Sequence, residues 1–255
     1  MNNVNKSDEK AILEICCYSI QSVINAATAK VNRVELCADI NAGGTTPSYG
    51  TILQAVPIHP INVYVIIRPR GGDFLYSDIE FQTMLNDISF CKQAGVKGVV
   101  IGLLKKDGSV DVERTKRLAE AAQPMDITFH RAIDMSIDLF KAMDDINDCG
   151  IKRILTSGGC NTAIEGIEVI KQMIAYNGNR LTIMAGSGVN ANNIRQLYDV
   201  GVREFHSSAT SFIASSMEYR NPKLNMGNKS GYDEYVIQVA DFEKIMEMKK
   251  IMNGF

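Results

Sequence analysis

Two short segments of the sequence repeat the same order of apolar, acidic and thiol side chains. Residues 13–16 read Leu-Glu-Ile-Cys, and residues 34–37 read Val-Glu-Leu-Cys. Alternate side chains of an extended strand share a face, so each glutamate lies on the same face as the cysteine two residues later. Carboxylates serve as general bases, and thiolates are soft ligands for metals such as Cu(I). The two segments therefore predict one site that contains Glu14, Cys16, Glu35 and Cys37.

Cationic and imidazole side chains stand at comparable places, near the C-terminal ends of other apolar runs. They are Arg68, Arg70, His130, Arg131 and His206. A buried carboxylate is destabilising unless a cation lies close to it, so we expect these groups to gather around the two glutamates. The alternative is a buried network of ion pairs that only fills the interior. The candidates for acid and base catalysis are Glu14, Glu35, His130, Asp134 and His206.

Three turns after such runs are small and rich in hydroxyl groups, at residues 156–159, 185–189 and 206–209. Barrel loops of this kind commonly bind phosphate through backbone N–H groups, and glycine lets the backbone approach the anion closely. The alternative is that these glycines only form tight turns. Because three arginines accompany the turns, we expect an anionic ligand. The candidates for binding it are Arg68, Arg70, Arg131, Ser157, Gly186, Gly188, Ser207 and Ser208.

These candidates need elements that bring them to one place, and the periodicity of the chain supplies such elements. Eight β-branched runs recur, and segments with helical periodicity lie between them. The expected strands are residues 12–17, 33–37, 63–68, 98–102, 127–130, 153–156, 182–185 and 204–207. The clearest expected helices are residues 77–94, 111–121, 138–148 and 163–176.

Alternating strands and helices are typical of a parallel sheet covered by helices. The 255 residues of the chain match the usual length of a one-domain barrel, about 250. We therefore predict an α/β fold, a single (β/α)8 TIM-type barrel over residues 1–255, in which residues 1–10 are a flexible N-terminal extension. An open, doubly wound sheet is the alternative. In the barrel, all the charged candidates would gather at the C-terminal ends of the strands, where active sites form.

The composition narrows the classes of partner. The formal net charge of -2, from 27 basic and 29 acidic side chains, gives no reason to expect nucleic acid or an anionic membrane. Residues 1–10 lack the pattern of a secretory signal, and no apolar run is long enough to cross a membrane. We therefore expect a cytoplasmic protein whose six cysteines are reduced thiols. Residues 217–232 form the least regular segment, which we expect to cross the barrel mouth or to contact another subunit.

The chain resembles the copper homeostasis CutC family in eight motifs that keep their order. They are LEICCYS (13–19), RVELC (33–37), GGTTPS (43–48), IRPRGGDFLYSD (67–78), TFHRAID (128–134), RILTSG (153–158), EFHSSA (204–209) and MEYRN (217–221). The resemblance implies a cytosolic TIM-type barrel that handles copper and forms a homodimer or a larger homo-oligomer. It also implies copper binding by the cysteines that match Cys16 and Cys37, and it carries over no established reaction.

The residue chemistry and the resemblance leave three functions in competition. The first is a Cu(I)-binding protein that uses Cys16 and Cys37, although two thiols outside a CxxC spacing form a weak metal motif. The second is an enzyme of the lyase, isomerase or hydrolase type that acts on a small anionic or phosphorylated metabolite, and it accounts for more of the polar residues. The third is an interaction protein that uses the barrel as a scaffold.

Overall fold

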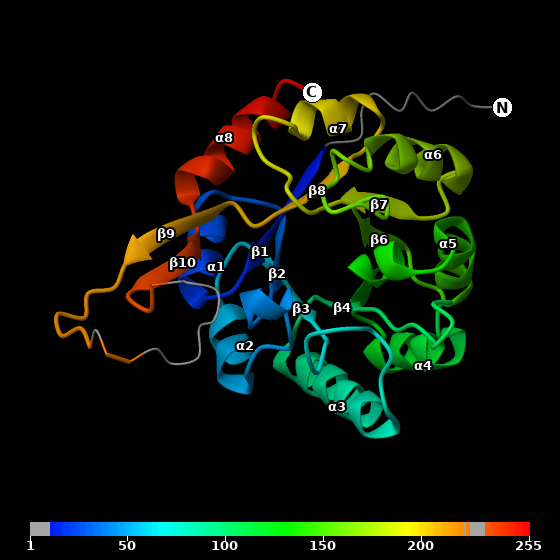
Figure 1. Ribbon diagram of the computed structural model, residues 1–255, viewed down its shortest axis with the longest axis horizontal. Helices are drawn as coiled ribbons and strands as arrows, with labels where there is room; N and C mark the ends of the chain where they lie inside the picture. The colour runs from blue at the N-terminus through cyan, green and yellow to red at the C-terminus, as the bar shows by residue number, and fades with distance from the viewer. Residues whose placement is uncertain (1–10, 222, 225–232) are drawn as a thin grey trace.

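A computed structural model of the protein describes residues 11–221, 223–224 and 233–255. Its centre is a barrel of eight parallel strands that pair in sequence order, with β8 beside β1 (Figure 1). The strands are β1 (Ile12–Cys17), β2 (Arg33–Leu36), β3 (Asn62–Ile66), β4 (Gly98–Ile101), β5 (Asp126–Phe129), β6 (Arg153–Thr156), β7 (Thr182–Ala185) and β8 (Glu204–Ser207). The predicted (β/α)8 barrel is confirmed, and the alternative of an open sheet is wrong.

Helices surround this barrel (Figure 1). They are α1 (Ile20–Thr28), α2 (Tyr49–Ala55), α3 (Asp78–Ala94), α4 (Val112–Ala122), α5 (Leu139–Asp148), α6 (Ile167–Asn177), α7 (Ile194–Asp199) and α8 (Phe242–Met252). Three helices were expected to begin one residue before their observed starts. The residues at the expected starts, Ser77, Asp111 and Asp138, are N-caps whose side chains accept a backbone N–H. The expected helix at residues 163–176 begins only at Ile167, because residues 163–166 form turns.

Side chains of β1 alternate between two buried environments. Ile15 and Cys17 belong to the main apolar core between the strands and the helices. Cys16 belongs instead to a small separate cluster with Cys37 and Ile66. Fully burying a side chain such as that of Ile15 contributes about 1.5–3 kcal/mol. The outer layer therefore stabilises the strand register that brings the two cysteines together.

The N-terminal half of the barrel interior holds a network of buried ion pairs. Arg33 bonds to both Glu14 and Glu204, and Arg153 Nε lies 2.8 Å from Glu204. We expected all the charged candidates at the C-terminal ends of the strands, and this is wrong for Glu14. The physical reason is its register, since Glu14 lies beside Arg33, which begins β2. In this half of the barrel, the alternative of an interior ion-pair network describes the structure.

A two-stranded antiparallel sheet, which we call the arm, extends from one side of the barrel (Figure 1). Its strands are β9 (Thr210–Ala214), which follows β8, and β10 (Val236–Ala240), which precedes α8. In the irregular segment predicted between them, residues 217–221 have no regular structure, and residues 222 and 225–232 lie outside the described residues. The expected N-terminal extension, residues 1–10, also lies outside them. None of the described helices combines the length and the apolar character that crossing a bilayer requires.

Candidate functional site

A cavity of about 510 Å³ lies at the C-terminal ends of the strands. Its wall includes ten of the predicted site residues: Cys16, Glu35, Arg68, His130, Arg131, Asp134, Gly188, His206, Ser207 and Ser208. The predicted residues that do not line it are Glu14, Cys37, Arg70, Ser157 and Gly186. Most of the candidates therefore meet at the end of the barrel where barrel active sites form.

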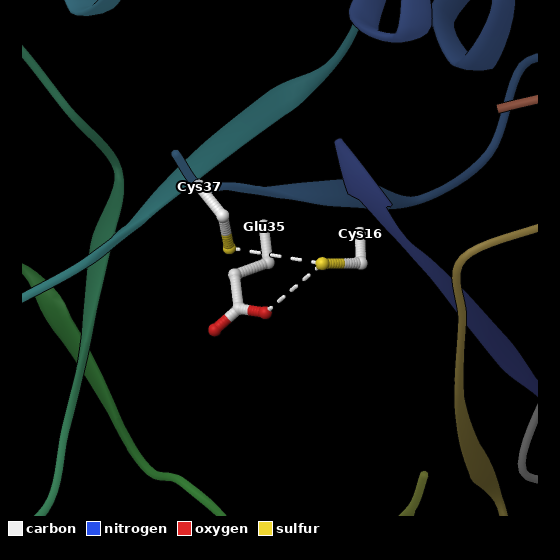
Figure 2. A group of neighbouring side chains, drawn as sticks. All are labelled: Cys16, Glu35 and Cys37. Atoms are coloured by element: carbon white, nitrogen blue, oxygen red, sulfur yellow. Dashed lines mark hydrogen bonds between the residues drawn. The ribbon is translucent and has the colours of Figure 1, made fainter. Parts of the chain in front are cut away.

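Two thiols and a carboxyl group lie together at this mouth, as Figure 2 shows. The Sγ atom of Cys16 is 3.7 Å from Sγ of Cys37 and 3.6 Å from Oε2 of Glu35. All three side chains are buried, and one ligand atom from each lies within 4.8 Å of the others. They meet because β1 and β2 pair in a register that sets Cys16 opposite Glu35. We call these three side chains the thiol–carboxyl group, and their spacing suits a single metal ion.

The imidazole of His206 on β8 adjoins the thiol–carboxyl group. Its Nδ1 lies 2.6 Å from Oε1 of Glu14, and its Nε2 lies 3.7 Å from Oε2 of Glu35. Burial alone would lower the pKa of His206, but hydrogen bonds to Cys16 and Glu14 raise it well above its usual value. A hydrogen bond from Cys37 outweighs burial and, together with His206, lowers the pKa of Cys16 well below that of an ordinary thiol. Both shifts favour the charged forms, a Cys16 thiolate beside a His206 imidazolium.

The two glutamates have opposite electrostatic surroundings. Burial raises the pKa of Glu35 to about 8, and the charge of Cys16 adds to that effect. Burial acts in the same direction on Glu14, but Arg33 and His206 outweigh it and bring the pKa of Glu14 down to about 2. Glu14 is therefore a charged anchor for His206. Glu35 carries a proton at neutral pH and can exchange it with a ligand.

Only one of the two arginines after β3 lines the cavity. Arg68 is buried there, and its Nη atoms donate to three backbone carbonyl oxygens of the loops after β2 and β3 at 2.6–2.8 Å. Arg70 lies outside the lining, where it bonds to Glu80 at 2.6 Å and to Asp73 at 3.0 Å. The structure therefore separates Arg70 from the other candidates for anion binding.

Asp134 joins the loops that follow β5 and β6. Its carboxylate accepts hydrogen bonds from Arg131 Nε at 2.8 Å, from the backbone N of Ser157 at 3.0 Å and from that of Gly159 at 3.1 Å. The hydroxyl group of Ser157 in turn accepts from Arg131 Nη2 at 2.7 Å. With its oxygens occupied in this way, Asp134 positions Arg131 and the turn after β6.

His130, which follows β5, is a buried and neutral imidazole. Its Nδ1 accepts the backbone N–H of Ala132 at 3.1 Å, so Nε2 carries the proton. Burial and the nearby charge of Arg68 lower the pKa of His130 to about 3. The Nε2 atom has no hydrogen-bond partner in the part of the chain that the structure describes. His130 therefore lines the cavity with an uncharged imidazole whose buried N–H is unpartnered among the described residues.

The turns after β7 and β8 divide the remaining candidates. Gly188, Ser207 and Ser208 line the cavity, and the hydroxyl group of Ser207 donates to the carbonyl oxygen of Val189 at 2.6 Å. A Cβ atom on Gly186 would lie 2.5 Å from Cδ1 of Leu155. A side chain at this position would therefore require the Leu155 side chain to shift.

Several residues of the site were not singled out in the sequence, among them three polar ones. Tyr18 and Ser187 line the cavity, and Arg33 holds Glu14 in place. The alternation of side chains along a strand could have identified Arg33, because it lies two residues before Glu35 on the same face of β2. Tyr18 and Ser187 follow strand ends, where alternation no longer sets direction, and Ser187 has a left-handed φ of +75°.

These features define a class of protein, a (β/α)8 barrel with a buried thiol–carboxyl group at its C-terminal mouth. Residues 11–211 match the model of the CutC family. The chain belongs to the CutC family.

Relatives support this membership over nearly the whole chain. A CutC family protein from Parabacteroides distasonis is 47% identical over 238 residues, which are 92% of this chain and 98% of the relative. One from Salmonella agona is 45% identical over 243 residues, which are 95% of this chain and 97% of the relative. The crystal structure of a candidate copper homeostasis protein CutC from Streptococcus agalactiae matches with a TM-score of 0.74 at 35% identity, over 78% of this chain and 98% of that one.

Proposed function

We propose that the protein binds Cu(I) through Cys16 and Cys37, with Glu35 as a third group, and serves copper homeostasis in the cytoplasm. The observation that carries the proposal is the 3.7 Å separation between the two Sγ atoms. Two thiolates held about 2.3 Å from a tetrahedral zinc ion lie about 3.8 Å apart, so the observed separation is one that two sulfur ligands of a single ion adopt.

The chemistry of the sulfur ligands also favours Cu(I). A thiol must lose its proton to bind a metal, and the pKa of Cys16 is already lowered. Thiolates are soft ligands that prefer Cu(I) to hard cations such as Mg²⁺. The Streptococcus agalactiae relative is itself described as a candidate copper homeostasis protein.

A titration with Cu(I) tests the proposal. The reduced wild-type protein is expected to take about one Cu(I) per chain from a coloured Cu(I) chelator, because two thiolates suffice for this ion. The double variant Cys16→Ala/Cys37→Ala is expected to take none. The measurement is the absorbance of the chelator complex as protein is added.

The matched control removes two thiols that lie outside the thiol–carboxyl group. The double variant Cys149→Ala/Cys160→Ala is expected to bind Cu(I) as the wild-type protein does, because neither residue belongs to the group. Unchanged binding in Cys16→Ala/Cys37→Ala would reject this site.

We also propose that the protein forms a homodimer or a larger homo-oligomer. The arm supports this, because Ile213 and Ile237 on its strands and Tyr219 beyond β9 are exposed apolar side chains, which gather at interfaces. Light scattering is expected to give a mass of at least two chains for the wild-type protein. Tyr219→Ser with Ile237→Ser is expected to shift the mass toward one chain. A monomeric wild-type protein at high concentration contradicts the proposal.

A second candidate function is catalysis on a small anionic or phosphorylated metabolite. The observation that favours it is the excess of polar side chains in the cavity wall, where Arg68, His130 and Arg131 lie beyond the groups that a metal needs. Glu35, with its pKa of about 8, and His206 would exchange protons with the substrate, as lyases, isomerases and hydrolases require. An enzyme of this kind needs an anion subsite in the same cavity.

A further inference from the structure

Arg68 is a buried cation without an anionic partner among the described residues. The residue is 5% exposed, and its Nη atoms donate to carbonyl oxygens. Removing a full positive charge from water is strongly unfavourable unless an opposite charge lies nearby. Neutral carbonyl groups satisfy hydrogen bonds of Arg68 but do not neutralise its charge. The cavity beside Arg68 is therefore electrostatically suited to an anion.

His130 and Arg68 both pack against the ring of Phe74. The ring centroid of Phe74 lies 5.0 Å from Cζ of Arg68 and 5.0 Å from the ring centroid of His130. His130 is 4% exposed, and its Nε2–H lacks a partner among the described residues. Buried donors are nearly always hydrogen-bonded, so an unpartnered donor near a buried cation points to a ligand with acceptor atoms.

A purely structural role for Arg68 explains only part of this arrangement. Through its Nη atoms, Arg68 ties together the loops that carry Gly44 and Gly72. That role accounts neither for a cation at the cavity nor for the free N–H of His130. Arg131 adds a second guanidinium to the wall, and its Nη1 has no partner within the described residues. The three side chains together present only donors.

We infer that Arg68, His130 and Arg131 form a subsite for an oxyanion, the carboxylate or phosphate group of a small metabolite, at the mouth of the barrel. This inference rests on the second candidate function and does not depend on copper binding. A cavity of about 510 Å³ limits the ligand to a small molecule. With its anion at this subsite, the remainder of the molecule shares the cavity with Glu35 and His206, the two proton-exchanging groups.

Thermal unfolding of the copper-free protein with added anions tests the subsite. The probes are inorganic phosphate and malonate, which distinguish a phosphate from a carboxylate ligand, and chloride at equal ionic strength controls for screening. At least one of the two oxyanions is expected to raise the Tm of the wild-type protein by about 3 °C or more at about ten times its Kd. Chloride is expected to produce no such shift.

Variants then locate the effect. Arg68→Met removes the charge and keeps the apolar stem, and it is expected to abolish the shift. Because Arg68 also ties two loops, His130→Asn provides a second variant, in which the amide oxygen replaces Nδ1 as the acceptor for Ala132 while the Nε2–H is lost. It is expected to weaken anion binding at least tenfold. Arg70→Met is the matched control, and it is expected to keep the full shift because Arg70 lies outside the cavity lining.

Two results would overturn the inference. One is the absence of a shift in the wild-type protein with either oxyanion, and the other is a shift that persists in both Arg68→Met and His130→Asn. The double variant Cys16→Ala/Cys37→Ala is expected to retain the anion shift, so that loss of copper binding and loss of anion binding are read separately. Substrate turnover in a separate assay decides the enzyme candidate, and anion binding without turnover leaves the subsite standing.

Discussion

Replacing Arg33 by methionine is expected to lower the free energy of unfolding by about 3–5 kcal/mol. Arg33 is the cation between Glu14 and Glu204, and its side chain is 5% exposed. Its removal leaves two buried carboxylates short of a positive charge. Methionine retains much of the apolar stem, so little of the effect comes from an empty volume. Urea unfolding at a constant m-value measures the change.

The matched control is an arginine whose ion pair lies on the surface. Arg180→Met removes a partner of Asp144 that is 41% exposed, and solvent already screens that pair, so we expect stability close to that of the wild-type protein. Combining Arg33→Met with Glu14→Gln is expected to restore part of the lost stability, because it removes one of the two buried carboxylates that have lost Arg33. If Arg33→Met unfolds at the same urea concentration as Arg180→Met, the interior network does not stabilise the fold.

Glu35→Gln is expected to change how stability depends on pH. The pKa of Glu35 is about 8 in the folded protein against an ordinary 4.5, so between these values the folded state holds a proton that the unfolded state has lost. The stabilisation from this proton is complete below pH 4.5 and disappears as the pH rises through 8. Glutamine resembles the protonated acid and does not titrate. As the pH rises through this window, the free energy of unfolding of the variant should therefore increase relative to that of the wild-type protein by about 1.4 kcal/mol per pH unit.

Urea unfolding of the copper-free proteins at several pH values between 5 and 8 measures that difference. Glu120→Gln, at an exposed position of α4, is the control, and its stability is expected to run parallel to that of the wild-type protein. Parallel curves for Glu35→Gln and the wild-type protein would show that Glu35 ionises normally and carries no proton at neutral pH.

The strands were predictable from the sequence because buried parallel strands leave a strong local signal. Four of the eight were predicted with the observed bounds, since β-branched runs mark them in the sequence. Parity also predicted that Glu35 and Cys16 share the interior with Cys37. The alternation of side chains does not indicate how far along the barrel axis a residue lies. Glu204 and His206 share a face of β8, yet one joins the ion-pair network and the other reaches the mouth.

The roles of the loop residues were harder to predict, because they depend on partners that the chain brings together only when it folds. Arg68 and Arg70 are two residues apart and look equivalent in the sequence. One donates to carbonyl oxygens at the cavity, and the other pairs with Glu80 on the outside. The arm left little signal, because β9 and β10 are short and lie far apart in the sequence.

The closure of the barrel by β8 against β1 has a consequence for synthesis. Glu14 and His206 are neighbours in space but 192 residues apart in the sequence. A chain leaving the ribosome exposes Cys16 and Cys37 early, whereas His206, whose hydrogen bond helps to lower the pKa of Cys16, arrives only with the last strand of the barrel. A chain truncated before β8 therefore lacks one of the groups that favour the thiolate form of Cys16.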